Sequence, residues 1–227
     1  MKKLCACLII LALIIISVFC SFSCSNKKVN PLYERVSELR LDLFEGKSEN
    51  FSLSACYGFK ETPYQNDGAV KTKVYALTFK LWEKETDGAT YTLSLDADGE
   101  TYKTNFKLNP VTHSLTASIE LENFSKKEFS VSILSGSAPE VITLKSIVPK
   151  NTIDYKKALD FLYKDQQNLI KAFCDESGAF NAEIYARIVV KNDKPFWYVG
   201  IASGNGNLKA LLIDGFSGET LAIREIF

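Results

Sequence analysis

The chain has 227 residues, and its 27 basic residues balance 27 acidic ones. This balance provides no strong field to draw nucleic acid or an anionic surface, so no nucleic-acid partner is expected. The length suits one large domain or two small ones, and we expect two. Ten Tyr and fifteen Phe beside a single Met favour sheet-rich structure with well-packed faces.

The first segment, 1–23, is predicted to be a signal peptide. A basic start precedes the apolar run 4–19, and the small Ser23 stands just before Cys24. This arrangement resembles a bacterial lipoprotein signal, in which the cysteine becomes the lipidated first residue of the mature chain. Ordinary secretion and an uncleaved anchor are the alternatives, because roughly 18 apolar residues can span a bilayer as a helix.

A lipid on Cys24 would fix the N-terminus to a membrane and leave the rest of the chain facing outward. The resemblance therefore implies an exported protein, lipid-anchored at the outer face of the cytoplasmic membrane or in the cell envelope. An uncleaved anchor would give the same topology. The segment 24–36 is expected to be a polar tether, because Asn30-Pro31 breaks any helix there.

The segment 37–150 is predicted to be an antiparallel β-sandwich. Apolar and polar residues alternate in several short runs, as in strands with one buried face. The apolar positions of these runs are Tyr75, Leu77, Phe79 and Leu81; Tyr91, Leu93 and Leu95; Leu115, Ala117, Ile119 and Leu121; and Phe129, Val131 and Ile133. Turn signals at Glu45-Gly46, Asp87-Gly88 and Asp98-Gly99 separate strands of a roughly seven-stranded sandwich. The architecture expected is immunoglobulin-like, without the Cys…Trp…Cys pattern of true immunoglobulin domains.

The segment 151–227 is predicted to be an α+β domain. Asn151-Thr152 offers a helix N-cap, Asp154 places negative charge in the first turn, and about twenty residues of amphipathic helix follow. Apolar residues recur on its inner face at Leu159, Leu162, Leu169 and Phe173. Extended runs between 184 and 226 are then separated by turns at Asn192-Asp193 and Asn205-Gly206. The fold expected is a helix packed on a three-stranded antiparallel sheet.

The C-terminal third, about 152–227, resembles the PepSY and PepSY-like domains of secreted bacterial proteins. The resemblance is carried by Phe196-Trp197-Tyr198-Val199 and by the turn sequence from Leu211 to Glu219. Within that turn, Asp214 can bond the backbone and Gly218 can supply a left-handed position. The resemblance implies a non-catalytic extracytoplasmic module that binds or restrains partners such as peptidases, and it supplies no catalytic residues.

The aromatic run around Trp197 provides the candidate partner-binding surface. Strand alternation puts Trp197 on one face and Phe196 with Tyr198 on the other. If Trp197 packs against the helix, Phe196 and Tyr198 join Tyr185 on the opposite face and form a surface for a protein partner. Burial of these aromatic residues against the first domain explains them equally well.

Catalytic and metal-binding patterns are weak in this sequence. His113 is the only histidine, and no nucleophile motif accompanies it, so we interpret it as an exposed loop residue. The segment 96–100 lacks the later ligands of a calcium loop and is predicted to be a hairpin turn. Cys56 and Cys174, the two cysteines beyond Cys24, form either one disulfide or two free thiols. No metal or other cofactor is expected.

The sequence therefore predicts a membrane-tethered extracytoplasmic binding or regulatory lipoprotein and not an enzyme. Its expected partners are the membrane, through the lipid on Cys24, and a protein such as an envelope peptidase. One alternative is an envelope hydrolase, which would need two carboxylates about 5–9 Å apart in a cleft. Another is a structural or assembly component of the cell surface that joins neighbours through free strand edges.

Overall fold

The computed structural model describes residues 29–62, 71–83, 90–110, 112–136, 138–204 and 206–226. Residues Pro31–Phe227 form one compact unit. Its described ranges are mostly β structure, with thirteen strands and two α-helices. The predicted signal peptide and Cys24 lie outside the described residues. In the part of the chain that the structure describes, no helix has the length and apolar character needed to cross a membrane.

A short 3-10 helix and nine strands make up the described part of 31–146. They are η1 (Pro31–Arg35), β1 (Val36–Lys47), β2 (Phe51–Thr62), β3 (Thr72–Glu83), β4 (Thr92–Ala97), β5 (Glu100–Asn105), β6 (Lys107–Asn109), β7 (Ser114–Glu120), β8 (Glu128–Ser135) and β9 (Ala138–Ser146).

Two helices and four strands follow. They are α2 (Tyr155–Asp165), α3 (Gln167–Lys171), β10 (Glu183–Lys191), β11 (Lys194–Ala202), β12 (Leu208–Asp214) and β13 (Thr220–Ile226).

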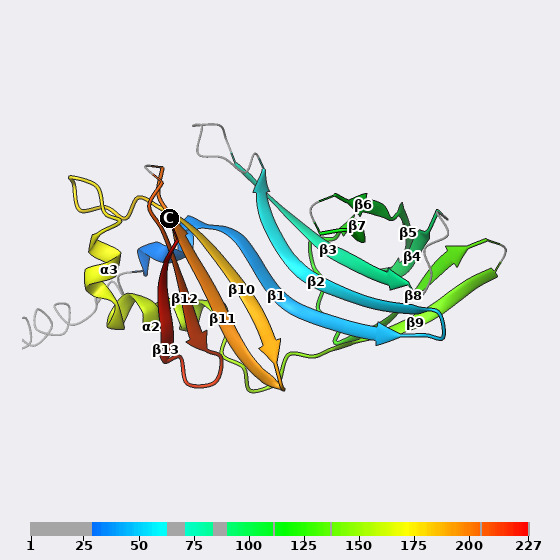
Figure 1. Ribbon diagram of the computed structural model, residues 1–227. Coiled ribbons are helices and arrows are strands. Elements are labelled where there is room, and N and C mark those ends of the chain that lie inside the picture. The colour runs from blue at the N-terminus through cyan, green and yellow to red at the C-terminus, as the bar shows by residue number, and fades with distance from the viewer. Residues whose placement is uncertain are drawn as a thin grey trace, which may run out of the picture. The chain divides into compact units, whose positions relative to one another are not determined.

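All thirteen strands belong to one sheet, which forks at β1 (Figure 1). One path runs β13-β12-β11-β10-β1-β2-β3-β7-β6, and a second branch leaves β1 through β9, β8, β4 and β5. β1 pairs in parallel with β10, whereas the other described pairings are antiparallel. The two halves of the chain therefore share a strand, and the expected sandwich of two separate sheets is not confirmed.

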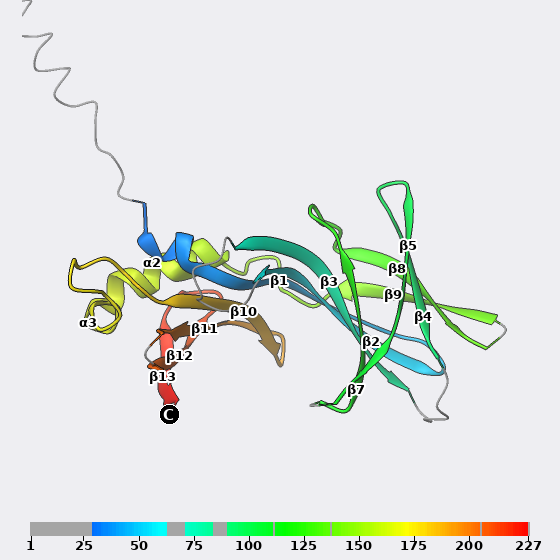
Figure 2. The ribbon, with the colours of Figure 1, turned by 90° about the horizontal axis from the view of Figure 1, so that it is seen from above.

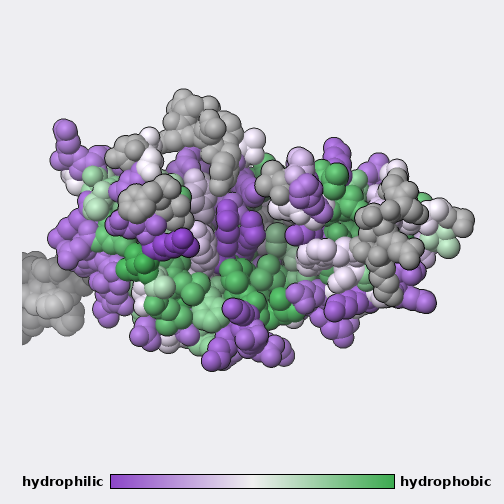
Figure 3. Space-filling model, in the orientation of Figure 1, coloured by the Kyte–Doolittle hydropathy of each residue, from purple (hydrophilic) through white to green (hydrophobic). Residues whose placement is uncertain are grey.

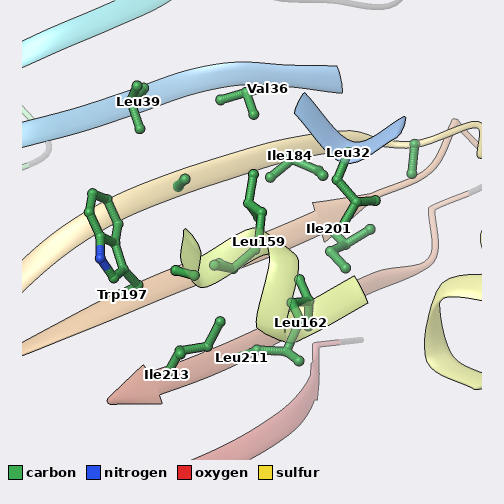
Figure 4. Close-up of a cluster of buried hydrophobic side chains, with 14 of the residues drawn as sticks. Leu32, Val36, Leu39, Leu159, Leu162, Ile184, Trp197, Ile201, Leu211 and Ile213 are labelled. Carbon is green, nitrogen blue, oxygen red and sulfur yellow. The ribbon is translucent and has the colours of Figure 1, made fainter. Parts of the chain in front are cut away.

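One face of this sheet is covered by two hydrophobic clusters. The helix-side cluster joins Leu159 and Leu162 of α2 to Trp197 of β11 and to Leu32 of η1 (Figure 4). The branch-side cluster joins β1, β2, β3 and β7 to β4, β8 and β9. Its largest fully buried members include Phe44, Phe79, Leu93, Ile133 and Leu144. Both clusters exclude water from the same face of the long path, and this burial is the main stabilising term of the fold.

The opposite face, which we call the outer face, is not covered by either cluster. Figure 2 shows the sheet from above. On one side of β1 the strands β10–β13 project forward, and on the other side β2, β3 and β7 do so. The bend coincides with an irregularity of the β1–β2 register between Arg40 and Asp42, and such bulges bend a strand. The outer face is therefore concave, with β1 along its floor.

Several predicted elements are confirmed. The alternating runs lie in β3, β4, β7 and β8, except that Tyr91 and Leu121 stand just outside β4 and β7. Asp98 and Gly99 have φ of 53° and 84° in the β4–β5 hairpin turn, and Asn192 and Asp193 have φ of 51° and 60° between β10 and β11. Two successive positive φ angles match the right-handed twist of the flanking strands, which is why these residue pairs mark hairpins.

Two predicted turns have different outcomes. The turn expected at Glu45-Gly46 is wrong, because both residues lie inside β1. A Cβ at Gly46 would overlap the backbone oxygen of Thr143, so this glycine permits the close approach of β9 and does not turn the chain. The turn expected at Asp87-Gly88 lies outside the described residues.

The predicted helix is shorter and begins later. Its N-cap is Asp154, which accepts a hydrogen bond from the backbone N–H of Lys157 at 2.8 Å. Thr152 instead donates its hydroxyl to the carbonyl of Pro149 at 2.6 Å. The helix ends at Asp165, and after Gln166 the short α3 changes direction. The expected twenty residues are therefore divided between two helices.

The C-terminal sheet has four strands of its own, β10–β13, and not three. It is also extended by β1, because Leu39 pairs with Ala186 in parallel register. Residues 31–36, expected to belong to the tether, form η1 and the first residue of β1, with Leu32 fully buried. Leu32 and Val36 are buried in the helix-side cluster, and Tyr33 donates its hydroxyl to Asp160 at 2.5 Å, so packing and a hydrogen bond order this short stretch.

Candidate functional site

The outer face contains a groove whose floor is built by β1, β2, β3 and β7. Strand pairing places Arg40, Gly58, Ala76 and Glu120 in one row across these four strands. A Cβ at Gly58 would overlap the backbone oxygen of Leu39, so the close approach of β1 requires glycine here. Only Gly58, which has no side chain, and Ala76, which has a methyl group, lie between Arg40 and Glu120. The surface is therefore depressed in the middle of this row.

Two hollows lie along this depressed row, and together we call them the outer groove. The first has a volume of about 340 Å³ and is lined by Glu38, Arg40, Lys60, Val74, Ala76 and Glu120, among others. The second has a volume of about 500 Å³ and extends toward Lys80, Thr116 and Val189. Arg40, Cys56 and Thr78 line both hollows, so the groove is continuous.

A buried carboxylate organises the cationic end of the groove. Glu38 Oε1 accepts from Nε of Arg187 at 2.8 Å and from Nε of Arg40 at 3.1 Å, and Oε2 accepts from Nη2 of Arg187 at 2.7 Å. The ammonium of Lys60 lies 4.0 Å from Oε2. The Glu38 side chain is 1% exposed, whereas Arg40, Arg187 and Lys60 are 38%, 32% and 62% exposed. Three cations therefore surround one carboxylate, which leaves a local excess of positive charge.

The ionisation of Glu38 follows from these contacts. Burial by itself raises its pKa, but the hydrogen bonds and charge of Arg187, together with Lys60 and Arg40, lower it more. The pKa of Glu38 is therefore held below its ordinary value of 4.5. At neutral pH this carboxylate is ionised, and it holds the two guanidinium groups in fixed positions on the face.

The predicted aromatic residues Tyr185, Phe196 and Tyr198 form a strip beside the groove, which we call the aromatic wall; it lies on the same face but lines neither hollow. Trp197 is buried in the helix-side cluster and donates its Nε1–H to the carbonyl of Ile153 at 2.9 Å. Its neighbours Phe196 and Tyr198 lie on the outer face with Tyr185, and all three are half-buried. Neither hydrophobic cluster contains them. The space-filling view shows hydrophobic side chains gathered beside a hydrophilic strip on this face (Figure 3).

A glycine lets the aromatic wall lie flat. Gly200 pairs with Tyr185, and a Cβ at this position would lie 3.3 Å from the Tyr185 ring and 3.7 Å from that of Tyr198. The two tyrosine rings therefore flank one glycine, a known way in which aromatic side chains shield a strand glycine. The Tyr185 hydroxyl donates to Glu183 at 2.8 Å, and Glu183 is also paired with Lys71.

The turn after β12 has the geometry that its sequence suggested. Asp214 Oδ1 accepts from the backbone N–H groups of Phe216 and Ser217, each at 2.8 Å. Gly218 has φ of 82°, and its missing side chain leaves room for the ring of Phe161 on α2. These residues position β13 beside β12, and they lie at the end of the aromatic wall, where Asp214 pairs with Phe196.

The remaining candidate residues lie apart from one another. His113 lies in the exposed turn between β6 and β7, with φ of 48°. Cys56 and Cys174 are both free thiols, and burial raises the pKa of Cys56. Within the described ranges, no group of three or more His, Cys, Asp or Glu side chains could hold a metal ion.

Sequence reasoning did not identify Glu38, Arg40 and Arg187. The first two alternate in β1 and could have been recognised as one face of a strand, but nothing in their spacing indicates that Arg187 lies beside them. That contact depends on the parallel pairing of β1 with β10, across 149 residues of sequence. The aromatic wall was accessible to sequence reasoning because its members alternate within neighbouring strands.

Comparison with known proteins adds no relative, since no family model, no curated protein and no solved structure matches this chain. The candidate site is therefore argued from its own geometry.

Proposed function

We propose that this protein is an exported lipoprotein that is held at a membrane through Cys24 and binds a protein partner in the outer groove. The lipid fixes one end of the chain to the cell envelope, and the groove holds or restrains the partner. An envelope peptidase is the kind of partner that the PepSY resemblance suggests. In this proposal, 151–227 is a PepSY-like module, and 37–150 is a domain of sandwich-like, immunoglobulin-like architecture.

The observation that carries the proposal is the difference between the two faces of the sheet. One face is covered by two hydrophobic clusters. The other is concave, contains both hollows, and carries the half-buried rings of Tyr185, Phe196 and Tyr198 beside Arg40 and Arg187. Aromatic and arginine side chains at a concave surface are the groups that dominate protein interfaces.

The chemistry of the groove suits binding better than hydrolysis by paired carboxylates. A general acid in such a reaction needs a raised pKa, whereas the pKa of Glu38 is lowered by its cations. Both oxygens of Glu38 already accept hydrogen bonds from arginine. Glu38 therefore serves to position the cations.

Filling the groove tests the proposal. Thr78 is exposed, lines both hollows and lies on a strand, so Thr78→Trp should block the groove while the fold tolerates it. After reversible cross-linking in intact cells, we expect the full chain to recover its partner and Thr78→Trp to recover at least about tenfold less, a loss of about 1.4 kcal/mol. The matched control is Ser130→Trp, at an exposed position of β8 away from the groove. Equal recovery by the two variants would contradict the proposal.

Assembly through a strand edge is a second candidate function, favoured by β13. This strand ends the long path of the sheet, and Leu221 and Ile223 on it are 48% and 46% exposed. Unprotected apolar edge strands pair with further strands. Light scattering over a range of protein concentrations distinguishes this function, because self-assembly through β13 predicts a mass that rises with concentration and falls again in Ile223→Lys.

A further inference from the structure

We infer that the first hollow of the outer groove binds a carboxylate of the partner, with Arg40 and Lys60 as the groups that hold it. The inference rests on the proposed function, because the hollow is part of the same groove, and it specifies the chemistry that the groove recognises. The carboxylate belongs to a polypeptide, either as its C-terminus or as an acidic side chain.

The first argument is the charge at this end of the hollow. Arg40, Arg187 and Lys60 place three positive charges around the single negative charge of Glu38, so the cations of this cluster outnumber its carboxylate. Arg40 and Lys60 line the hollow themselves.

The second argument is that Arg40 is held in place before any ligand arrives. Its Nε donates to Glu38, which is almost fully buried. Its terminal nitrogens make no hydrogen bond among the described residues, and a guanidinium presents its donors in a fixed planar fork that matches a carboxylate. A donor fixed in this way loses little conformational entropy on binding, which favours affinity.

The third argument is the shape and polarity of the hollow. Glu120 stands in the same row as Arg40, three strand spacings or about 14 Å away between Cα atoms, and the low floor of Gly58 and Ala76 lies between them. A ligand carboxylate is attracted to the Arg40 end and repelled at the Glu120 end. The volume of about 340 Å³ suits the last residues of a peptide or one acidic side chain with its neighbours.

Short peptides titrated into the full chain, purified in detergent, test this inference. The probes are N-acetyl-trialanine with a free carboxylate, the same peptide with a C-terminal amide, and N-acetyl-Ala-Glu-Ala-amide. We expect the amide to bind at least about tenfold more weakly than the better of the two acidic peptides, because one charge-assisted hydrogen-bonded pair is lost. The stronger acidic peptide identifies the source as a C-terminus or a side chain. Equal binding of all three, or of none, would overturn the inference.

Charge variants test whether the carboxylate binds in the first hollow. Arg40→Gln is expected to weaken the acidic peptide about tenfold, and Lys60→Gln, at a highly exposed side chain, provides the same test with less risk to folding. The matched control Lys145→Gln removes an exposed cation of β9 that lines neither hollow and should leave binding unchanged. Wild-type affinity in both cation variants would overturn the inference. If no peptide binds but Thr78→Trp still lowers partner recovery, the carboxylate site fails while the proposed function stands.

Discussion

Glu38 is the residue on which the centre of the outer face depends. Its carboxylate is removed from water, and a buried charge is tolerated only when partners replace the lost hydration. Arg187 supplies two hydrogen bonds from β10, and Arg40 supplies one from β1. The Glu38–Arg187 pair therefore joins β1 to β10, the two strands whose parallel pairing unites the halves of the chain.

Removing the principal partner of Glu38 should be costly. Arg187→Ala is expected to lower the free energy of unfolding by about 2–3 kcal/mol, because it leaves a buried carboxylate with weaker compensation. Urea unfolding measures this change. The control is Lys145→Ala, which breaks the 3.4 Å surface pair with Glu128 and should change stability by less than about 0.5 kcal/mol. A similar small effect of both substitutions would show that Glu38 does not depend on Arg187.

The lowered pKa of Glu38 predicts a pH dependence of stability. A carboxyl whose pKa is lower in the folded state stabilises the protein above its unfolded pKa of about 4.5 and loses that contribution as the pH falls through the folded value. We expect the free energy of unfolding to fall more steeply below about pH 4.5 in the wild type than in Glu38→Gln. Parallel pH profiles of the two proteins would contradict this assignment.

At the scale of elements, β1 explains what the sequence could and could not predict. Its leucines at 39, 41 and 43 alternate as if they shared one face. The irregularity between Arg40 and Asp42 shifts this alternation, so that Leu39 and then Phe44 are buried on the covered face. A bulge inserts one residue into the pattern, and nothing in the local sequence marks where it does so.

The fork at β1 is fixed by a second buried carboxylate. Asp42 accepts from Lys127 at 2.5 Å, from Ser146 at 2.6 Å and from the backbone N–H of Leu43 at 2.9 Å. These contacts come from β1, from the end of β9 and from the segment before β8. They satisfy the hydrogen-bonding capacity of the Asp42 carboxylate at the point where β1 stops pairing with β10 and begins to pair with β9. This arrangement depends on contacts that are remote in sequence.

The start of α2 allows the predicted and observed caps to be compared. Asp154→Ala removes the hydrogen bond to Lys157 N–H and is expected to lower the free energy of unfolding by about 1 kcal/mol. Asn151→Ala alters the residue that the sequence suggested as the cap, and it should change stability by less than about 0.5 kcal/mol. Thermal unfolding of both variants gives the comparison. A larger loss in Asn151→Ala would place the helix start where the sequence suggested.

At the scale of the whole molecule, the two halves of the chain form one folded unit. The strands of each half were predictable from alternation and turn residues, because these signals are local. The sharing of β1 was not, because it depends on pairings between distant segments. The shared face of Tyr185, Phe196 and Tyr198 could be predicted because it depends on local alternation. The charged cluster beside it was missed because it depends on the pairing of distant segments.

The proposed attachment to the envelope also concerns the whole chain. If Cys24 carries the lipid, metabolic labelling with a fatty acid should mark the wild type, and Cys24→Ala should lose the label and leave the membrane fraction. Cys20→Ala is the matched control and should retain both properties. Labelling that persists in Cys24→Ala would contradict lipid attachment at this residue, and membrane retention without a label would favour an uncleaved anchor.

The central claim is that a protein partner binds in the outer groove and against the aromatic wall beside it. Photo-crosslinking amino acids placed at Thr78 in β3 and at Tyr198 in β11 test this most directly, with exposed Tyr163 on α2 and Ser130 on β8 as controls. The account predicts that Thr78 and Tyr198 give adducts with the same partner in intact cells, while the two controls give none. Adducts from the control positions alone, or no adduct from either Thr78 or Tyr198, would contradict it.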